Sequence, residues 1–306
     1  MKRHLVYIIN ILFSFILLSC TSQSTVSTNN RYIDFPQVQE LKAKTIQLDT
    51  ALFRYPFRIH ALDNKAVVLD LHGTDHFFHA FSYPEFHYLS SFGKRGDSPE
   101  EMLSAENFRW SGKDLWTLDA NKSELTELEF ALSGDTLLRQ EVVKLDKEIL
   151  RALDFVVYED STFIIPDYTG DNRFCQVSSE GKLLRKFGTI PSANEEALEN
   201  SRPALAQAWR SFIDYNLRKG VLVAATQLGE VLEIYNLKDS THVVCVGPHG
   251  EPEFQVAEGY GIPTGIMGFG DVQVTDNAIY AVFQGKTFKD IMESAKQGNK
   301  LPDGGQ

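Results

Sequence analysis

Cysteine is scarce in this sequence of 306 residues, which holds only Cys20, Cys175 and Cys245. A fold stapled by several disulfide bridges is therefore excluded, because such folds need more cysteines than this chain has. Cys175 and Cys245 fall on different strands of the repeats described below, so matching geometry is not implied, although an oxidising compartment would allow them to pair. We expect both to be buried free thiols.

Short catalytic signatures are absent as well. The sequence contains no Gly-x-Ser-x-Gly, Walker loop, His-Glu-x-x-His or Cys-x-x-Cys motif, so none of the enzyme classes that those motifs mark is indicated. Basic residues are also few, because 30 lysines and arginines stand against 41 aspartates and glutamates, for a net charge of -11. A nucleic-acid partner needs a basic surface and is not expected.

No apolar run is long enough for a comfortable transmembrane helix. The run at the N-terminus, Leu5 to Leu18, is interrupted by Asn10 and Ser14 and follows a positively charged head with Lys2 and Arg3. A charged head followed by a short apolar segment is typical of a secretory signal peptide.

The segment ends in Leu17-Leu18-Ser19-Cys20, which resembles a bacterial lipobox. The resemblance implies cleavage before Cys20 and lipid attachment there, with residues 1–19 as signal peptide; the alternative is an ordinary signal peptide with a chance cysteine. Residues 20–40 begin with a run rich in serine, threonine and asparagine and are predicted to be a flexible tether. Residues 21–24 carry no acidic side chain, which favours an outer-membrane anchor that faces the periplasm.

One short pattern recurs five times along the chain: a turn, an apolar run of strand-forming residues and, in the first three copies, a closing aspartate. The starts of the copies are about 48 residues apart at first and roughly 58 apart later. The copies span residues 64–70, 112–119, 160–167, 219–226 and 276–283. Repeats of this period indicate solenoids, propellers or arrays.

The surroundings of each copy favour a β-propeller. A mixed run precedes the copy and two strand-like runs follow it, which makes four short antiparallel strands in ~40–50 residues, the size of one propeller blade. The fifth repeat has only its first two strands, and residues 286–297 have helical spacing instead. We therefore predict an all-β fold over residues 41–306, with an open or truncated six-bladed ring. Lys44–Leu48 is the predicted N-terminal strand that would complete the last blade.

The connections between repeats are themselves similar. Residues 92–101, Phe-Gly-Lys-Arg-Gly-Asp-Ser-Pro-Glu-Glu, match residues 246–253, and their glycines suit a positive φ where an outer strand leaves its blade. Arg95 and His249 occupy equivalent places in these two loops. Loops on a rigid scaffold often bind ligands, so both are candidate ligand-binding residues; the alternative is that they are solvated loop positions.

Together, the blade pattern, the loop at Gly93–Glu101 and the lipobox resemble the TolB-like, six-bladed β-propeller lipoproteins of Bacteroides-type bacteria. The resemblance covers about residues 40–290. It implies an envelope propeller, and it brings no catalytic residue, metal or cofactor to this chain.

Two groups of polar residues could each have either a functional or a structural role. Asp70, Asp119 and Asp167 could form a ring of carboxylates near a channel, yet we expect them to accept hydrogen bonds within their own turns. The histidines His72, His76 and His79 could bind a metal, but their spacing crosses a turn into a strand where alternate side chains diverge. We expect those histidines to take polar loop and outward strand positions.

These observations predict a lipid-anchored binding module of the bacterial envelope rather than an enzyme. The expected partner is a protein, a peptide or a glycan, besides the membrane held through Cys20. The alternative is an envelope hydrolase or lyase that uses acids near the channel, which would require convergent acidic side chains. A purely structural scaffold would show neither a binding patch nor such a site.

Overall fold

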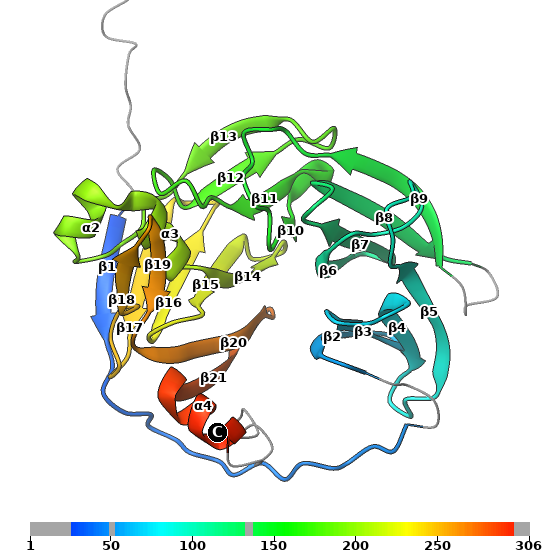
Figure 1. Ribbon diagram of the computed structural model, residues 1–306, viewed down its shortest axis with the longest axis horizontal. Helices are drawn as coiled ribbons and strands as arrows, with labels where there is room; N and C mark the ends of the chain where they lie inside the picture. The colour runs from blue at the N-terminus through cyan, green and yellow to red at the C-terminus, as the bar shows by residue number, and fades with distance from the viewer. Residues whose placement is uncertain (1–25, 49–52, 132–136, 297–306) are drawn as a thin grey trace, which may run out of the picture.

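The computed structural model describes residues 26–48, 53–131 and 137–296. Figure 1 shows that its sheets stand like blades around a common axis, in chain order from β2 to β21. The innermost strands of successive blades, β2, β6, β10, β14 and β20, contact one another around that axis. The fold is therefore the predicted all-β propeller.

Four blades are four-stranded antiparallel meanders. Blade 1 comprises β2 (Pro56–Leu62), β3 (Lys65–Asp70), β4 (His76–Ser82) and β5 (Tyr88–Lys94). Blade 2 comprises β6 (Ala105–Ser111), β7 (Asp114–Asp119), β8 (Glu124–Phe130) and β9 (Leu137–Lys144). Blade 3 comprises β10 (Val156–Val157), the 3-10 turn η1 (Glu159–Ser161), β11 (Phe163–Pro166), β12 (Phe174–Val177) and β13 (Leu183–Phe187). Blade 4 comprises β14 (Ser211–Asn216), β15 (Val221–Thr226), β16 (Val231–Asn236) and β17 (Thr241–Val246).

The repeated sequence pattern is the second strand of each blade, namely β3, β7, β11, β15 and β21. In β3, β7 and β15 the last five residues are all buried, instead of alternating with exposed ones. Neighbouring blades cover both faces of β7 and β15, whereas β3 has blade 2 on one face and Leu48 and Phe53 over the other. Apolar clusters fill the four interfaces between successive blades. This double burial explains why the run is continuously apolar and therefore visible in the sequence.

Blade 5 has two strands, β20 (Ile266–Val274) and β21 (Ile279–Thr287), followed by helix α4 (Phe288–Lys296). The predictions of a two-stranded fifth repeat and of a helix after it are confirmed. On the far side of β21, Figure 1 shows an open sector of the ring that reaches round to β2. The outer edge of β21 pairs with no other strand of the described chain.

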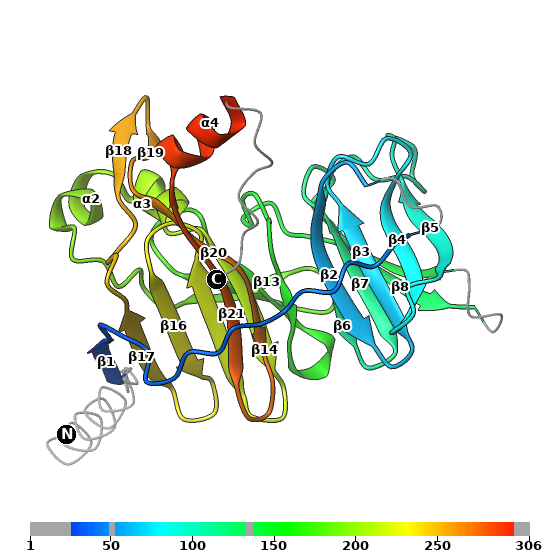
Figure 2. The same cartoon turned by 90° about the horizontal axis from the view of Figure 1, so that it is seen from below.

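The N-terminal part differs from the prediction. Lys44–Leu48 forms no strand; Ile46, which stays 43% exposed, and Leu48 instead lie over the apolar face of blade 1, where apolar contact rather than strand pairing places them. Strand β1 (Val26–Arg31), inside the segment predicted to be a tether, pairs in parallel with β17 of blade 4. From β1 the chain crosses the open sector to reach blade 1 (Figure 2).

Blade 4 carries an insertion that the sequence reading did not resolve. Helices α2 (Glu195–Asn200) and α3 (Arg202–Ala208) precede the blade, and the hairpin β18 (Phe254–Ala257) and β19 (Tyr260–Pro263) follows it. The side chain of Asn194 caps α2 by accepting from Ala197, and Trp209 is buried beneath the insertion. These elements account for the longer spacing of the later repeats.

Candidate binding cleft

A group of charged and amide side chains from the inner strands holds the ring together at its axis. Arg58 of β2 donates to the Asn107 carboxamide oxygen at 2.6 Å and to Asp271 of β20 at 2.7 Å. Arg109 of β6 donates to Asp154 at 2.9 Å, and Asp154 also accepts from the backbone of Ile213 in blade 4 at 3.1 Å. We call Arg58, Asn107, Arg109, Asp154 and Asp271 the hub.

Burial controls the protonation of this region. Burial lowers the pKa of Arg58, an effect that neighbouring Arg109 strengthens and Asp154 and Asp271 oppose. Burial, then the charges of Arg109 and Arg58, lower the pKa of His60 to about 2. His60 is therefore neutral, and its Nε2 accepts from Arg109 at 3.1 Å. Arginines that donate and carboxylates that accept several hydrogen bonds within the group indicate a structural hub rather than a reactive one.

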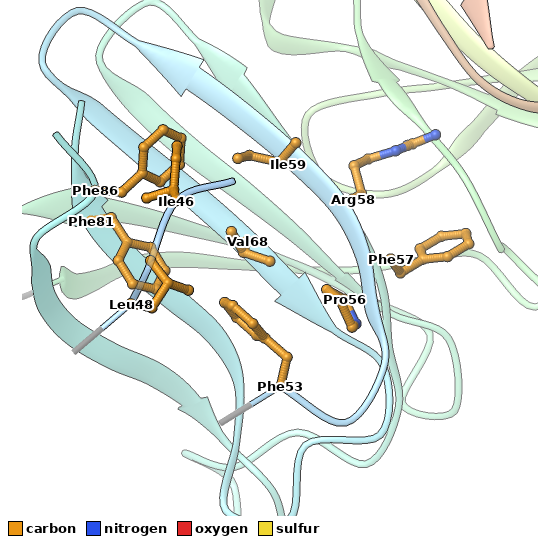
Figure 3. Close-up of a pocket in the computed structure, with 10 residues that line it drawn as sticks. All are labelled: Ile46, Leu48, Phe53, Pro56, Phe57, Arg58, Ile59, Val68, Phe81 and Phe86. Carbon is orange, nitrogen blue, oxygen red and sulfur yellow. The ribbon is translucent and has the colours of Figure 1, made fainter. Parts of the chain in front are cut away.

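Next to the hub, blade 1 exposes an apolar hollow toward the open sector. The hollow has a volume of about 320 Å³. Its walls come from β2, β3, β4 and the chain that crosses the open sector: Ile46, Leu48, Phe53, Pro56, Phe57, Arg58, Ile59, Val68, Phe81 and Phe86. In Figure 3, Ile46, Leu48 and Phe53 gather with Phe81 over the sheet, while the Arg58 side chain points away from them.

A second hollow of about 530 Å³ adjoins the first one. It is lined by Tyr55, Pro56, Phe57, Phe212, Gln227, Met267, Phe269, Gly270, Asp271, Val282 and Gln284, from blades 1, 4 and 5. Pro56 and Phe57 line both hollows, so the two adjoin at these residues. The rings of Phe57 and Phe212 lie 5.8 Å apart, and Asp271 of the hub also lines this hollow. We call the two hollows together the cleft.

Strand β21, which borders the cleft, has large apolar side chains on its exposed face. Its odd-numbered residues Ile279, Ala281 and Phe283 pack into the core shared with blade 4. Its even-numbered residues face outward, so that Tyr280 is 64% exposed and Val282 50% exposed. Phe288 and Met292 of α4 are also largely exposed. Large apolar side chains gathered on one exposed surface indicate an interaction site.

Arg95, one of the two predicted ligand-binding residues, lies in the connection from blade 1 to blade 2. Its guanidinium donates to the carbonyl of Gly73 at 2.9 Å and that of Leu71 at 3.2 Å. The same group covers the ring of Phe77, with 4.2 Å to the ring centre. These contacts support the loop between β3 and β4.

His249, the other predicted ligand-binding residue, lies in the connection from blade 4 to blade 5. It is exposed, its backbone N–H donates to Glu230 at 3.1 Å, and its ring lies 5.9 Å from that of Phe283 on β21. Arg95 and His249 therefore occupy separate connections and form no common site.

The three repeated aspartates accept hydrogen bonds around their own turns, as predicted. Asp70 accepts from the backbone of Arg54, Tyr55 and His72 at 2.8, 2.6 and 3.3 Å. Asp119 likewise accepts from four backbone N–H groups, and Asp167 accepts from Thr169 and pairs with Lys186. A hydrolase or lyase built on these three carboxylates gains no support from such contacts.

The predicted cluster of histidines also makes local contacts rather than a shared site. His79 bonds the hydroxyl of Ser91 at 2.8 Å, and the ring of His72 lies against Tyr55. Within the described ranges no three His, Cys, Asp or Glu side chains are placed to hold a metal ion. Cys175 is buried and Cys245 half-buried, and neither forms a disulfide with the other.

The residues that make up the hub and the cleft were not singled out from the sequence. Phe57 and Arg58 fall in the run that precedes the first repeat. A charged residue in the middle of a strand expected to be buried was the one sequence feature that could have indicated the hub. The predicted lipid-attachment residue, Cys20, lies outside the described residues. Among the helices that the structure describes, none has the length and apolar character needed to span a membrane.

Comparison with known proteins identifies the fold family. A family model described as TolB-like 6-blade propeller-like matches residues 34–301. That range includes all five blades, the insertion on blade 4 and the helix after β21. No curated protein shows sequence similarity to the chain.

Several solved structures resemble the chain at low identity. A Bacteroides fragilis protein described as exported is 12% identical with a TM-score of 0.46, over 91% of this chain and 93% of that one. A Lactobacillus plantarum protein is 11% identical with a TM-score of 0.44, over 77% and 66%. A duf4221-family member from Bacteroides vulgatus is 10% identical with a TM-score of 0.40, over 71% and 62%.

Proposed function

Given that the chain belongs to the TolB-like six-blade propeller family, we propose that it is a lipid-anchored envelope protein that binds a partner protein in the cleft. The observation that carries the proposal is the coincidence of two features. The cleft, whose hollow on blade 1 is apolar, opens beside β21, and the outer edge of β21 is unpaired within the described residues.

A strand edge of this kind can bind an extended segment of another protein. Backbone N–H and C=O groups of the partner would pair with β21, as β16 pairs with β15 in blade 4. Alternate side chains of the bound segment would then lie beside Tyr280 and Val282 and point into the cleft. The backbone pairing supplies affinity, and the shape of the cleft selects the side chains.

The chemistry of the walls favours a protein over a glycan. The hollow on blade 1 is lined by aliphatic and aromatic side chains with one arginine, which points away from it (Figure 3). Such walls gain most from burying apolar side chains, at about 25 cal/mol per Å² of apolar area removed from water. Sugar hydroxyls in the same place would lose hydrogen bonds to water without replacement.

The membrane part of the proposal rests on the N-terminal sequence. The lipobox-like Leu17-Leu18-Ser19-Cys20 supports attachment through Cys20, and the absence of acidic residues at 21–24 supports an outer-membrane position facing the periplasm. A partner in the periplasm or in the same membrane is therefore within reach of the cleft.

Photo-crosslinking in cells tests the binding site. A benzoylphenylalanine at position 280 should give one defined adduct, and the same probe at Leu184, equally exposed on β13 of blade 3, should give none. A second substitution, Val282→Asp, should abolish the adduct because a carboxylate would enter the apolar cleft. Equal labelling at positions 280 and 184, or an adduct that survives Val282→Asp, would contradict the proposal.

A further inference from the structure

A third cavity lies on blades 3 and 4 and shares no lining residue with the cleft. It has a volume of about 220 Å³ and is lined by Leu150, Arg151, Leu153, Tyr168, Gln207 and Arg210. Three connections meet there: the chain between β9 and β10, the loop after β11, and the turn between α3 and β14. None of the lining residues is acidic.

Its two arginines differ from most others in this acidic protein. Six arginines of the described chain form ion pairs: Arg58, Arg109, Arg139, Arg173, Arg202 and Arg218. No described carboxylate lies within 4.0 Å of the guanidinium groups of Arg151 or Arg210, and neither group donates a hydrogen bond within the described residues. Arg151, which is exposed, and Arg210, which is half-buried, therefore line one cavity without a described carboxylate beside them.

Tyr168 supplies an independent observation. Its side chain is nearly inaccessible, with 9% of the residue exposed, and its buried hydroxyl has no hydrogen-bond partner in the described part of the chain. Burial raises the pKa of this hydroxyl to about 12, so it keeps its proton and can donate. An orphaned buried hydroxyl is costly, but its oxygen has almost no accessible surface, so a ligand reaches it only after a small shift of the ring or of the wall around it.

Gln207 adds an amide side chain to the wall of the cavity. Its side-chain oxygen accepts from the backbone of Gly261 on β19 at 3.4 Å, which leaves the amide N–H groups free to serve the cavity. Two arginines and a glutamine thus line one small space, with the Tyr168 hydroxyl behind its wall, while Leu150 and Leu153 provide apolar walls.

From this arrangement we infer that the cavity binds the carboxylate of a small organic acid. Planar guanidinium groups match the two oxygens of a carboxylate, and the leucines suit a short hydrocarbon body. A volume of about 220 Å³ suits a small acid such as butyrate or benzoate rather than a larger ligand. The net charge of -11 disfavours a dianion such as phosphate, because long-range repulsion grows with ligand charge.

Calorimetric titration of the purified full chain tests this site, with sodium butyrate and sodium benzoate as probes and sodium chloride to hold ionic strength constant. At least one probe should bind with 1:1 stoichiometry and raise the melting temperature. Arg151→Gln and Arg210→Gln should each weaken binding about tenfold or more, as expected for loss of a charge-assisted hydrogen bond. Arg185→Gln, which removes an exposed arginine from β13, should leave the Kd unchanged.

Tyr168→Phe separates ligand binding from general damage to the fold. Without ligand this variant should melt at a higher temperature than the wild type, because the unsatisfied hydroxyl is gone. It should also bind the carboxylate probe several-fold more weakly. Absence of any carboxylate-specific binding, undiminished binding by the arginine variants, or equal binding of inorganic phosphate would each overturn the inference. Crosslinking in the cleft does not depend on these outcomes.

Discussion

Arg58 and Asp271 are 213 residues apart in sequence, yet the guanidinium of one donates to the carboxylate of the other at 2.7 Å. The pair joins blade 1 to blade 5 at the axis, while the outer parts of the same two blades are separated by the open sector (Figure 1). The ring is thus connected at its centre and open at its rim. Partner binding at the rim can then proceed without dismantling the hub.

Arg58→Ala should destabilise the protein by about 3–5 kcal/mol, because it removes the ion pair to Asp271 and leaves buried Asp154 with Arg109 as its one remaining arginine. The free energy of unfolding from urea titration measures this effect. Arg218→Ala removes an arginine whose pair with Asp276 is largely exposed, so it should change stability little. If both variants unfold at the same urea concentration, the hub does not hold the ring together.

His60 should make the protein sensitive to mild acid. Its pKa in the folded state is about 2, against an ordinary value of 6.5, so the unfolded chain takes up a proton below about pH 6.5 that the folded chain refuses. Burial of the neutral His60 ring therefore costs no stability above pH 6.5. Below that pH the free energy of unfolding falls by up to about 1.4 kcal/mol for each pH unit. His60→Gln keeps an acceptor for Arg109 and should flatten the fall in unfolding free energy between pH 6.5 and 4.5.

The control for His60→Gln is built into the same titration. Between pH 7.5 and 8.5 histidine is neutral in both states, so variant and wild type should have parallel stability curves. A variant curve that stays parallel to the wild type down to pH 4.5 would show that His60 does not titrate on unfolding.

The blades were predictable from the sequence because their second strands are buried on both faces. Val67, Val68 and Leu69 of β3 form a continuous apolar run, and so do the corresponding residues of β15, while in β7 the run is interrupted by the buried Thr117. Turn residues at regular spacing then located the neighbouring strands. The closing aspartates were also readable, since a carboxylate at a strand end has few local uses besides accepting from the turn.

The site was not predictable, because long-range pairing creates it. Nothing near Arg58 in sequence reveals Asp271, and the cleft exists only where β2 and β21 approach each other across the ring. Strand β1 was missed for a related reason: its partner β17 lies more than 200 residues away. Arg95 and His249 do lie in the connections where they were expected, and their part in binding stays a prediction.

Cys20→Ser should prevent lipid attachment. Cells that express the wild type in the presence of labelled palmitate should show a labelled band, and the variant should show none and should leave the membrane fraction. Replacing Ser19 by leucine provides a second test, since cleavage at a lipobox needs a small residue before the cysteine. A variant Cys20→Ser that still carries label would place the modification elsewhere.

Asp119→Asn distinguishes a structural from a catalytic role for the repeated aspartates. The carboxylate of Asp119 is buried and accepts from the backbone of Leu103, Ser104, Asn121 and Lys122. An amide keeps one acceptor oxygen and turns its NH2 group toward N–H donors, so we expect a loss of about 1–3 kcal/mol in unfolding free energy. A catalytic carboxylate would behave differently, since its amide would abolish turnover and leave stability nearly unchanged. Urea denaturation of Asp119→Asn beside Asp114→Asn, which alters a less buried aspartate at the other end of β7, decides between the two roles.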